Sequence, residues 1–310
     1  MTPKVIRTRG LVKDYGRNRA LAGLDLEVRP GEVFGFIGPN GAGKSTTIRV
    51  LMDLLRPDGG EVEVFGQAPA AGGPALRSRI GYLPGELAMP GRVSAREHLR
   101  HLSALRGGRG LARIEALAER FKLDLDRPFR TLSRGNKQKV GVIQAFMHDP
   151  ELLILDEPTS GLDPLLQREF LDLVRETAAR GATVFMSSHV LHEVESVADR
   201  VAVIRDGLTV DVDSVRGLRE RAGQRVSLTF VEPPDAAAFA DVPGVEGARV
   251  EDRTLHCLLH GEPDALLKAA ARHRVVRWTA RDRDLEDLFM DVYRFGPDGV
   301  NGANGVQDAR

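Results

Sequence analysis

The sequence predicts an α/β fold with a mainly parallel sheet, followed by a smaller α+β domain. The runs "ELLILDEP" and "ATVFMSSH" are short and strongly apolar, as strands buried on both faces are. Between them, Leu166, Phe170 and Val174 recur at helical spacing along one face of an amphipathic segment. Alternation of strand, helix and strand is typical of parallel sheets that are joined by crossover helices.

The chain before these runs predicts two strands and then a helix. The segment "LAGLDLEVRPGEVFGFIGPNG" contains two strand-like runs separated by Pro30 and Gly31. The segment "STTIRVLMDLLRPDGG" predicts a helix that stops at Pro57 and Gly59. Its apolar face is expected to carry Ile48, Leu51, Met52 and Leu55.

The middle of the chain, from about residue 94 to residue 149, is helical in pattern. Two stripes of apolar side chains recur there at helical spacing. The first stripe comprises Leu111, Ile114, Leu117, Ala118 and Phe121, and the second comprises Val140, Ile143 and Met147.

The pattern changes near residues 215–225, so we expect one domain over residues 1–220 and a small accessory α+β domain over residues 221–295. In the second domain "RVSLTFVEPPD" and "VVRWTA" predict strands, with Trp278 in the core, and "DALLKAAARHR" predicts a helix. The segment "DLEDLFMDVYRF" places Leu285, Leu288, Phe289 and Val292 on one helix face. Residues 296–310 are rich in Gly and Asn, without periodicity, and are expected to be disordered.

Composition restricts the functional classes. Lys plus Arg and Asp plus Glu both number 44, so a net charge of zero gives no support for a nucleic-acid partner. The single Cys257 excludes an internal disulfide and fits a reducing compartment. The N-terminal segment has no apolar core of signal-peptide type, and no run approaches the roughly 20 apolar residues of a membrane span. Any membrane role is therefore expected to come through a partner chain.

The segment "GPNGAGKST" fits the phosphate-loop pattern G-x-x-x-x-G-K-[ST]. Glycines let backbone N–H groups surround a polyphosphate, and the following helix presents its positive end. Lys44 is suited to the β- and γ-phosphates of ATP, and the Ser45 hydroxyl is suited to ligate Mg²⁺. The expected ATP-binding residues here are Gly38, Pro39, Asn40, Gly41, Ala42, Gly43, Lys44, Ser45 and Thr46.

Two acids follow the apolar strand "LLILDEP", and both can reach the crevice at the end of a parallel sheet. Asp156 is suited to hold Mg²⁺, directly or through water. Glu157 is suited to act as the catalytic base that polarises the attacking water.

Several motifs together resemble the nucleotide-binding subunit of an ABC (ATP-binding cassette) transporter, over about residues 4–215. The segment "LSRGNKQ" resembles the signature motif, "SGLD" resembles the D-loop, and "SSH" ends in His189 at the place of the catalytic switch histidine. Tyr15 in "KDYG" matches the aromatic residue that stacks on adenine, and a packing role is its alternative. The resemblance implies a P-loop NTPase cassette with an antiparallel β subdomain and an inserted helical subdomain at about residues 86–150.

The resemblance also implies a mechanism that needs two copies of the chain. In a head-to-tail homodimer, Ser133 and Gly135 would contact the ATP bound to the partner's phosphate loop. His189 would bond the γ-phosphate, and Asp163 would communicate between the two ATP sites. The segments "IGYLPGE", "LSRGNKQKVG" and "DLEDLFMDVYRF" are most similar to cassettes of bacterial drug, antibiotic or lipid exporters. A cassette of this kind works at the inner face of the cell membrane with separately encoded permease subunits.

The sequence departs from the family pattern at two places. Arg134 and Asn136 replace the second Gly and the Gln of the commonest signature, LSGGQ. In "YLPGE", Gly85 stands where the family usually has a glutamine that faces Mg²⁺ and the attacking water. We expect a coupling loop that still works, in which Glu86 supplies the missing contact, and the alternative is that water completes the metal shell.

Two other functions compete with transport. One is a soluble ABC protein acting on DNA or ribosomes, which would usually show a second cassette, a coiled coil or zinc modules. The other is a regulator that binds ATP without hydrolysing it. The segments "HVLHEVE" and "HCLLH" suggest metal ligands only superficially, and we expect His192 on a helix surface and no metal at His256, Cys257 and His260.

Overall fold

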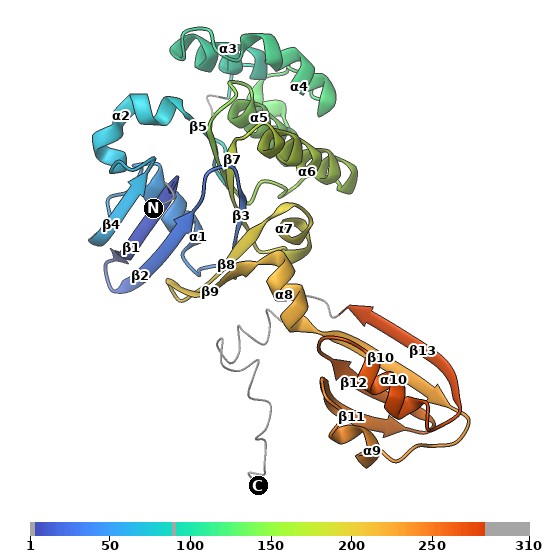
Figure 1. Cartoon of the computed structure of the whole chain (residues 1–310). Coiled ribbons are helices and arrows are strands. Elements are labelled where there is room, and N and C mark those ends of the chain that lie inside the picture. The colour runs from blue at the N-terminus through green and yellow to red at the C-terminus, as the bar shows by residue number, and fades with distance from the viewer. Residues whose placement is uncertain (1–3, 89–90, 283–310) are drawn as a thin grey trace. The chain divides into compact units, whose positions relative to one another are not determined.

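A computed structural model describes residues 4–88 and 91–282 of the chain (Figure 1). It divides into two compact units, Met1–Val212 and Asp213–Arg310, so the helix at Val215–Ala222 lies with the second unit. The predictions for "DLEDLFMDVYRF" and for the tail at residues 296–310 fall outside the described residues.

A six-stranded sheet forms the centre of the first unit (Figure 1), and its strand order is β5-β6-β7-β3-β8-β9. Neighbouring strands from β5 to β8 are parallel, which confirms the predicted mainly parallel sheet. Every residue of β3, β6 and β7 is buried, as the apolar runs indicated. The strands are β3 (Val33–Ile37), β5 (Ile80–Leu83), β6 (Leu152–Asp156), β7 (Thr183–Ser188), β8 (Arg200–Arg205) and β9 (Leu208–Ser214).

A second sheet of the first unit is antiparallel, in the order β2-β1-β4, and confirms the expected β subdomain. Its strands are β1 (Ile6–Tyr15), β2 (Asn18–Val28) and β4 (Gly59–Val64). Ile6 and Leu24 of this sheet share one apolar core with Phe34 and Phe185 of the central sheet. The two sheets therefore form one body that holds the segment between β3 and the following helix.

Helices connect the strands of the first unit. They are α1 (Lys44–Leu51), α2 (Pro69–Ser78), α3 (Ala95–Leu105), α4 (Ile114–Arg120), α5 (Arg134–Phe146), α6 (Pro164–Ala179) and α7 (Leu191–Val197), with short 3₁₀ turns η1 (Leu111–Arg113) and η2 (Phe129–Thr131). The helices α3, α4 and α5 lie together, as expected for a helical subdomain inserted between β5 and β6 (Figure 1).

Two helical predictions need correction. The helix α1 ends at Leu51 and not before Pro57, because Met52 leaves the helical conformation and Asp53 has a φ of 57°. Leu111 does not join the buried stripe that contains Ile114 and Phe121, since it lies in η1 and is 51% exposed.

The second unit is a small α+β domain whose described strands lie in the order β11-β12-β10-β13. Its elements are α8 (Val215–Ala222), β10 (Gln224–Phe230), α9 (Ala237–Ala240), β11 (Val245–Glu251), β12 (Thr254–Leu259), α10 (Asp264–Ala270) and β13 (Val275–Asp282). From β10 onward, this β-α-β-β-α-β succession with β10 between β12 and β13 is a ferredoxin-like split βαβ arrangement. Phe230, Phe239 and Leu266 fill its core, and Trp278 packs against them as expected.

His256 and Cys257 of the second unit have structural partners in its sheet and core. His256 Nδ1 lies 3.0 Å from Ser227 Oγ on the neighbouring strand, while Cys257 points into the core. Burial raises the pKa of the Cys257 thiol to about 11, which disfavours the thiolate that a metal would need. Within residues 4–88 and 91–282 no cluster of His, Cys, Asp and Glu could hold a metal ion.

His148, just after α5, is a buried histidine of the first unit with only 4% of its surface exposed. Its Nε2 lies 3.2 Å from the Ile80 carbonyl oxygen, and its Nδ1 has no partner. Burial, with help from the charge of Arg106, lowers the pKa of His148 from 6.5 to about 4. The imidazole is therefore neutral in the folded protein at pH 7.

We predict that His148 makes folding stability depend on acid. The unfolded chain binds a proton near pH 6.5 and the folded chain only near pH 4, so stability is lost as pH falls between these values. The loss approaches about 3 kcal/mol. Urea unfolding of His148→Leu should show a shallower decline than the unchanged chain, whereas the exposed His192→Leu should not. Equal slopes in all three proteins would contradict the assignment.

Candidate nucleotide site

The phosphate loop follows β3 and leads directly into α1. Gly43 precedes the helix with a φ of 110°, and a Cβ there would lie 2.7 Å from the Ala20 carbonyl oxygen. A Cβ on Gly38 would lie 2.4 Å from the Ile204 carbonyl oxygen. Only glycine fits either position, so the two glycines of the motif are required by the close approach of the neighbouring backbone. The loop thus holds the N-terminus of α1 at the carboxyl edge of the parallel sheet.

Lys44 is folded over this loop and is only 6% exposed. Its ammonium donates to the carbonyl oxygens of Gly38, at 2.6 Å, and Pro39, at 3.1 Å. It also pairs with Glu157 Oε1 at 3.3 Å. A buried positive charge held at the mouth of the loop is suited to an anionic ligand.

The strand β6 ends in Asp156, whose carboxylate is 5% exposed. Ser187 Oγ donates to Asp156 Oδ1 at 2.7 Å and accepts from the Glu157 N–H at 3.1 Å. Asp156 Oδ2 faces Gly85, where an added Cβ would lie 3.3 Å from it. One carboxylate oxygen is thus fixed by Ser187, and the other faces a position that has no side chain.

Glu157 has a left-handed backbone, with a φ of 49°. This conformation costs a residue other than glycine about 1 kcal/mol, and such strain often occurs at functional sites. His189 Nδ1 lies 2.6 Å from Glu157 Oε2, while Glu157 Oε1 faces Lys44. Because a carboxylate accepts hydrogen bonds, the Nδ1–H of His189 donates. Three predicted residues from distant segments therefore meet at one point.

The signature segment lies against the D-loop of its own chain. Ser133 caps α5 by accepting from the Asn136 N–H at 3.3 Å, and Arg134 donates to Ser160 Oγ at 3.0 Å. A Cβ on Gly135 would lie 2.6 Å from the Gly161 carbonyl oxygen, so the two segments touch through backbone. Asp163 caps α6 by accepting from the N–H groups of Leu165 and Leu166, at 3.1 and 3.0 Å.

The described chain does not bring all of the predicted site residues together. Within the parts that the structure describes, no hydrogen bond or ion pair joins residues 133–136 to the phosphate loop at residues 38–46. Tyr15 ends β1 with 45% of its surface exposed. Glu86 is exposed and makes no hydrogen bond or ion pair with a described residue. The signature segment and the phosphate loop are therefore not joined by a hydrogen bond or ion pair in the described chain.

Sequence reasoning missed two polar residues, Ser187 and Gln138, that support the segment carrying Asp156 and Glu157. Ser187 links Asp156 to Glu157, and the buried Gln138 side chain donates to the Pro158 carbonyl oxygen at 2.8 Å. The available signal for Ser187 was the pair of hydroxyl residues at the end of the apolar run "ATVFMSSH", where a fully buried strand needs polar partners.

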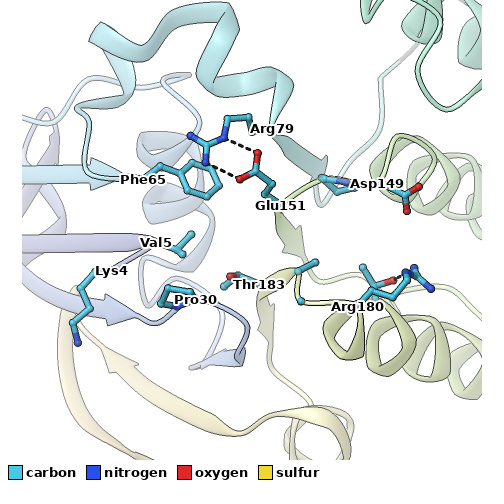
Figure 2. Close-up of a pocket in the computed structure, with 13 residues that line it drawn as sticks. Lys4, Val5, Pro30, Phe65, Arg79, Asp149, Glu151, Arg180 and Thr183 are labelled. Carbon is cyan, nitrogen blue, oxygen red and sulfur yellow. Dashed lines mark hydrogen bonds and ion pairs between the residues drawn. The ribbon is translucent and has the colours of Figure 1, made fainter. Parts of the chain in front are cut away.

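A cavity of about 570 Å³ lies elsewhere, next to the residues that precede β6 and β7 (Figure 2). Arg79 and Glu151 face one another there in a two-bond pair of 2.7 and 2.8 Å, and the guanidinium lies 3.8 Å from the Phe65 ring centre. Ligands of parallel α/β sheets bind outside the carboxyl ends of the strands. This cavity is at the amino ends, so it is not the nucleotide site.

The fold and the geometry at Lys44, Asp156 and Glu157 define a P-loop nucleotide-hydrolysing cassette. Residues 21–160 match the family model described as ABC transporter. The chain is 37% identical over 262 residues to a daunorubicin resistance ATP-binding protein of Streptomyces coeruleorubidus, covering 82% of this chain and 83% of that one. The chain belongs to the family of ABC transporter ATP-binding proteins, and it is an ATPase that binds adenine nucleotide.

Other relatives and a solved structure belong to the same family. A fluoroquinolones export ATP-binding protein of Mycobacterium tuberculosis is 33% identical over 299 residues, which are 93% of each chain. The bacitracin transport ATP-binding protein of Bacillus licheniformis is 36% identical, over 70% of this chain and 72% of that one. The solved ATP-binding subunit of an ABC transporter superposes with a TM-score of 0.65 at 30% identity, over 70% of this chain and 92% of that one. No helix of the described chain is long and apolar enough to cross a membrane.

Proposed function

We propose that this ATPase powers an exporter of drugs, antibiotics or lipids, working as a homodimer on the inner face of the cell membrane with separately encoded permease subunits. The observation that carries the homodimer is the separation of the two half-sites within one chain. Each ATP then needs the phosphate loop of one copy and the signature of the other. The names of the relatives, which concern drug resistance and export, support the direction of transport.

Within the phosphate-loop half-site we assign roles by charge. Lys44 stabilises the β- and γ-phosphates, and Glu157 orients and deprotonates the attacking water. His189 gives up its hydrogen bond to Glu157 and donates to the γ-phosphate instead. Asp156 and Ser45 fit a Mg²⁺ ion, because the Asp156 carboxylate is buried with one oxygen directed toward Gly85, which has no side chain. When bound, the ion neutralises charge on the phosphate oxygens.

The signature half-site belongs to the ATP of the other copy. The exposed Ser133 begins α5 and, with the backbone at Gly135, contacts the γ-phosphate next to the positive end of that helix. Arg134 and Asn136 add a charge and an amide at the same edge. The signature half-site touches the D-loop through the contact between Gly135 and Gly161. Asp163 of the D-loop communicates between the two ATP sites. The exposed ring of Tyr15 stacks on adenine.

Position 85 faces Asp156, whereas Glu86 is directed to solvent. In our proposal Glu86 reaches the metal site only when the loop shifts in the closed dimer with its permease. Glu86→Ala should then lower permease-stimulated ATP hydrolysis several-fold and leave ATP binding unchanged. Glu119→Ala, which removes another exposed carboxylate, is the matched control. Unchanged stimulated turnover in Glu86→Ala would remove Glu86 from the mechanism and leave water as the occupant beside Gly85.

The proposed function is tested with inverted membrane vesicles that contain the full chain and its permease. ATP should drive uptake of one of the compounds named for the relatives, such as daunorubicin, a fluoroquinolone or bacitracin. Vesicles with Glu157→Gln should not take up the compound. Purification of the chain with ribosomes or DNA, and with no membrane protein, would overturn the proposal. Tight ATP binding without phosphate release in the full complex would instead identify a regulator.

A further inference from the structure

Glu193 is a buried carboxylate on α7 to which neither the sequence motifs nor the roles above give a task. It lies in the first turn of α7 and is 7% exposed. Glu193 Oε2 accepts from Thr159 Oγ1 at 2.5 Å and from Ser188 Oγ at 3.3 Å. Both hydroxyl residues are also buried, at 4% and 1% exposure. A buried carboxylate persists in a fold only where hydrogen bonds compensate its desolvation.

The two hydroxyl groups belong to the two segments that carry the catalytic residues. Thr159 comes two residues after Glu157, in the turn where the Ser160 N–H donates to the Glu157 carbonyl oxygen at 3.1 Å. Ser188 ends β7 and directly precedes His189. The shared acceptor at Glu193 is a direct link between these two segments, in addition to the His189–Glu157 contact and the bonds that Ser187 makes to Asp156 and the Glu157 N–H.

The two neighbouring serines at the end of β7 have different hydrogen-bond partners. Successive strand residues point to opposite faces, so Ser187 reaches Asp156 and the Glu157 N–H while Ser188 turns toward Glu193. Ser187 therefore holds the end of β6, and Glu193 holds the next turn of the same segment. Burial raises the pKa of Glu193, and the neighbouring Glu157 acts in the same direction.

We propose that Glu193 is a positioning residue that fixes the Glu157 segment and the His189 segment relative to one another through Thr159 and Ser188. The inference depends on the catalytic roles proposed for Glu157 and His189. Leu162 donates its N–H to the Thr159 carbonyl oxygen at 3.0 Å. The bond between Thr159 and Glu193 therefore also anchors the start of the D-loop. Glu193 thus connects three functional segments without touching substrate.

The test compares Glu193→Met with Glu193→Gln in the full chain. Methionine fills the space but leaves the Thr159 hydroxyl without its acceptor and the Ser188 hydroxyl with only the Val190 carbonyl oxygen, at 3.2 Å. Glutamine retains an acceptor oxygen. We expect kcat for ATP hydrolysis to fall about tenfold in Glu193→Met, the size of a lost buried hydrogen bond, with KM for ATP nearly unchanged. Glu193→Gln should restore most of kcat. His192→Met, on the exposed face of the same helix, is the control.

A double-mutant cycle with Thr159→Val separates positioning from general stability. If the two side chains act together, the double variant should be no slower than Glu193→Met alone. Additive losses, failure of glutamine to restore kcat, or a fall in activity that only follows the urea midpoint would overturn the proposal. An unchanged chain that lacks ATPase activity altogether would count against the proposed function, whereas an active Glu193→Met would count against Glu193 alone.

Discussion

Replacement of Glu157 by glutamine is expected to lower the rate of ATP hydrolysis by roughly 10²- to 10⁴-fold, the usual contribution of a general base. Glutamine keeps the size of the side chain and can still face His189, but it cannot take a proton from water. The left-handed backbone at Glu157 is retained, since it is set by Ser187 and by the turn that follows. The loss should therefore appear in kcat and not in the fold.

Binding of ATP to Glu157→Gln should be as tight as to the unchanged chain, or tighter. Glu157 pairs with Lys44 at 3.3 Å and with His189 at 2.6 Å, so phosphates must compete with its charge for both partners. A neutral amide removes that competition. Single-turnover phosphate release and equilibrium ATP titration measure the two effects separately.

The matched control for Glu157→Gln is Glu151→Gln. Glu151 is an acid five residues before the start of the Asp156–Glu157 pair, but its charge pairs with Arg79 at the opposite edge of the sheet. The Glu151→Gln variant should hydrolyse ATP at the normal rate. Normal hydrolysis by Glu157→Gln itself would assign the base elsewhere.

Much of the fold can be predicted from sequence, because the most apolar strands can be buried in only one part of the fold. The runs that form β6 and β7 are apolar on both faces, and only the centre of an α/β sheet buries both. In contrast, α2 was not predicted, since "PAAGGPALRS" contains two prolines and two glycines and Gly73 interrupts the helix with a φ of 55°. Tertiary packing of Leu76 holds this segment against its weak helix propensity.

The residues of the candidate site also fall into two groups, those that the sequence predicts and those that it does not. Residues adjacent in a motif, such as Lys44 and Ser45 or Asp156 and Glu157, are recognisable because the local backbone alone places them at the carboxyl edge of the sheet. Glu193 and Gln138 act through partners that lie far away in the sequence, at Thr159 and Pro158. Such pairs depend on how helices dock onto strands, which no local pattern encodes.

Replacement of Lys44 by methionine is expected to weaken ATP binding by about 2–5 kcal/mol, the effect of truncating one member of a buried charge pair, which is tens- to thousands-fold in affinity. Methionine matches the length of the stem but leaves the phosphates without their cation. Lys44→Arg should not restore binding, since the planar fork cannot reproduce a point charge that donates to Gly38 and Pro39 at once.

The control for Lys44→Met is Lys4→Met, which removes a partly shielded lysine that pairs with Glu27 at 2.8 Å, away from the loop. Titration with ATP should show normal affinity in this control. The variant Lys44→Met also leaves Glu157 paired with His189 alone, so its free energy of unfolding should fall modestly without ATP. With ATP present the difference from the unchanged chain should be larger, because ATP stabilises the protein that binds it more tightly. Normal ATP affinity in Lys44→Met would mean that the buried ammonium serves to neutralise Glu157 and not to bind phosphate.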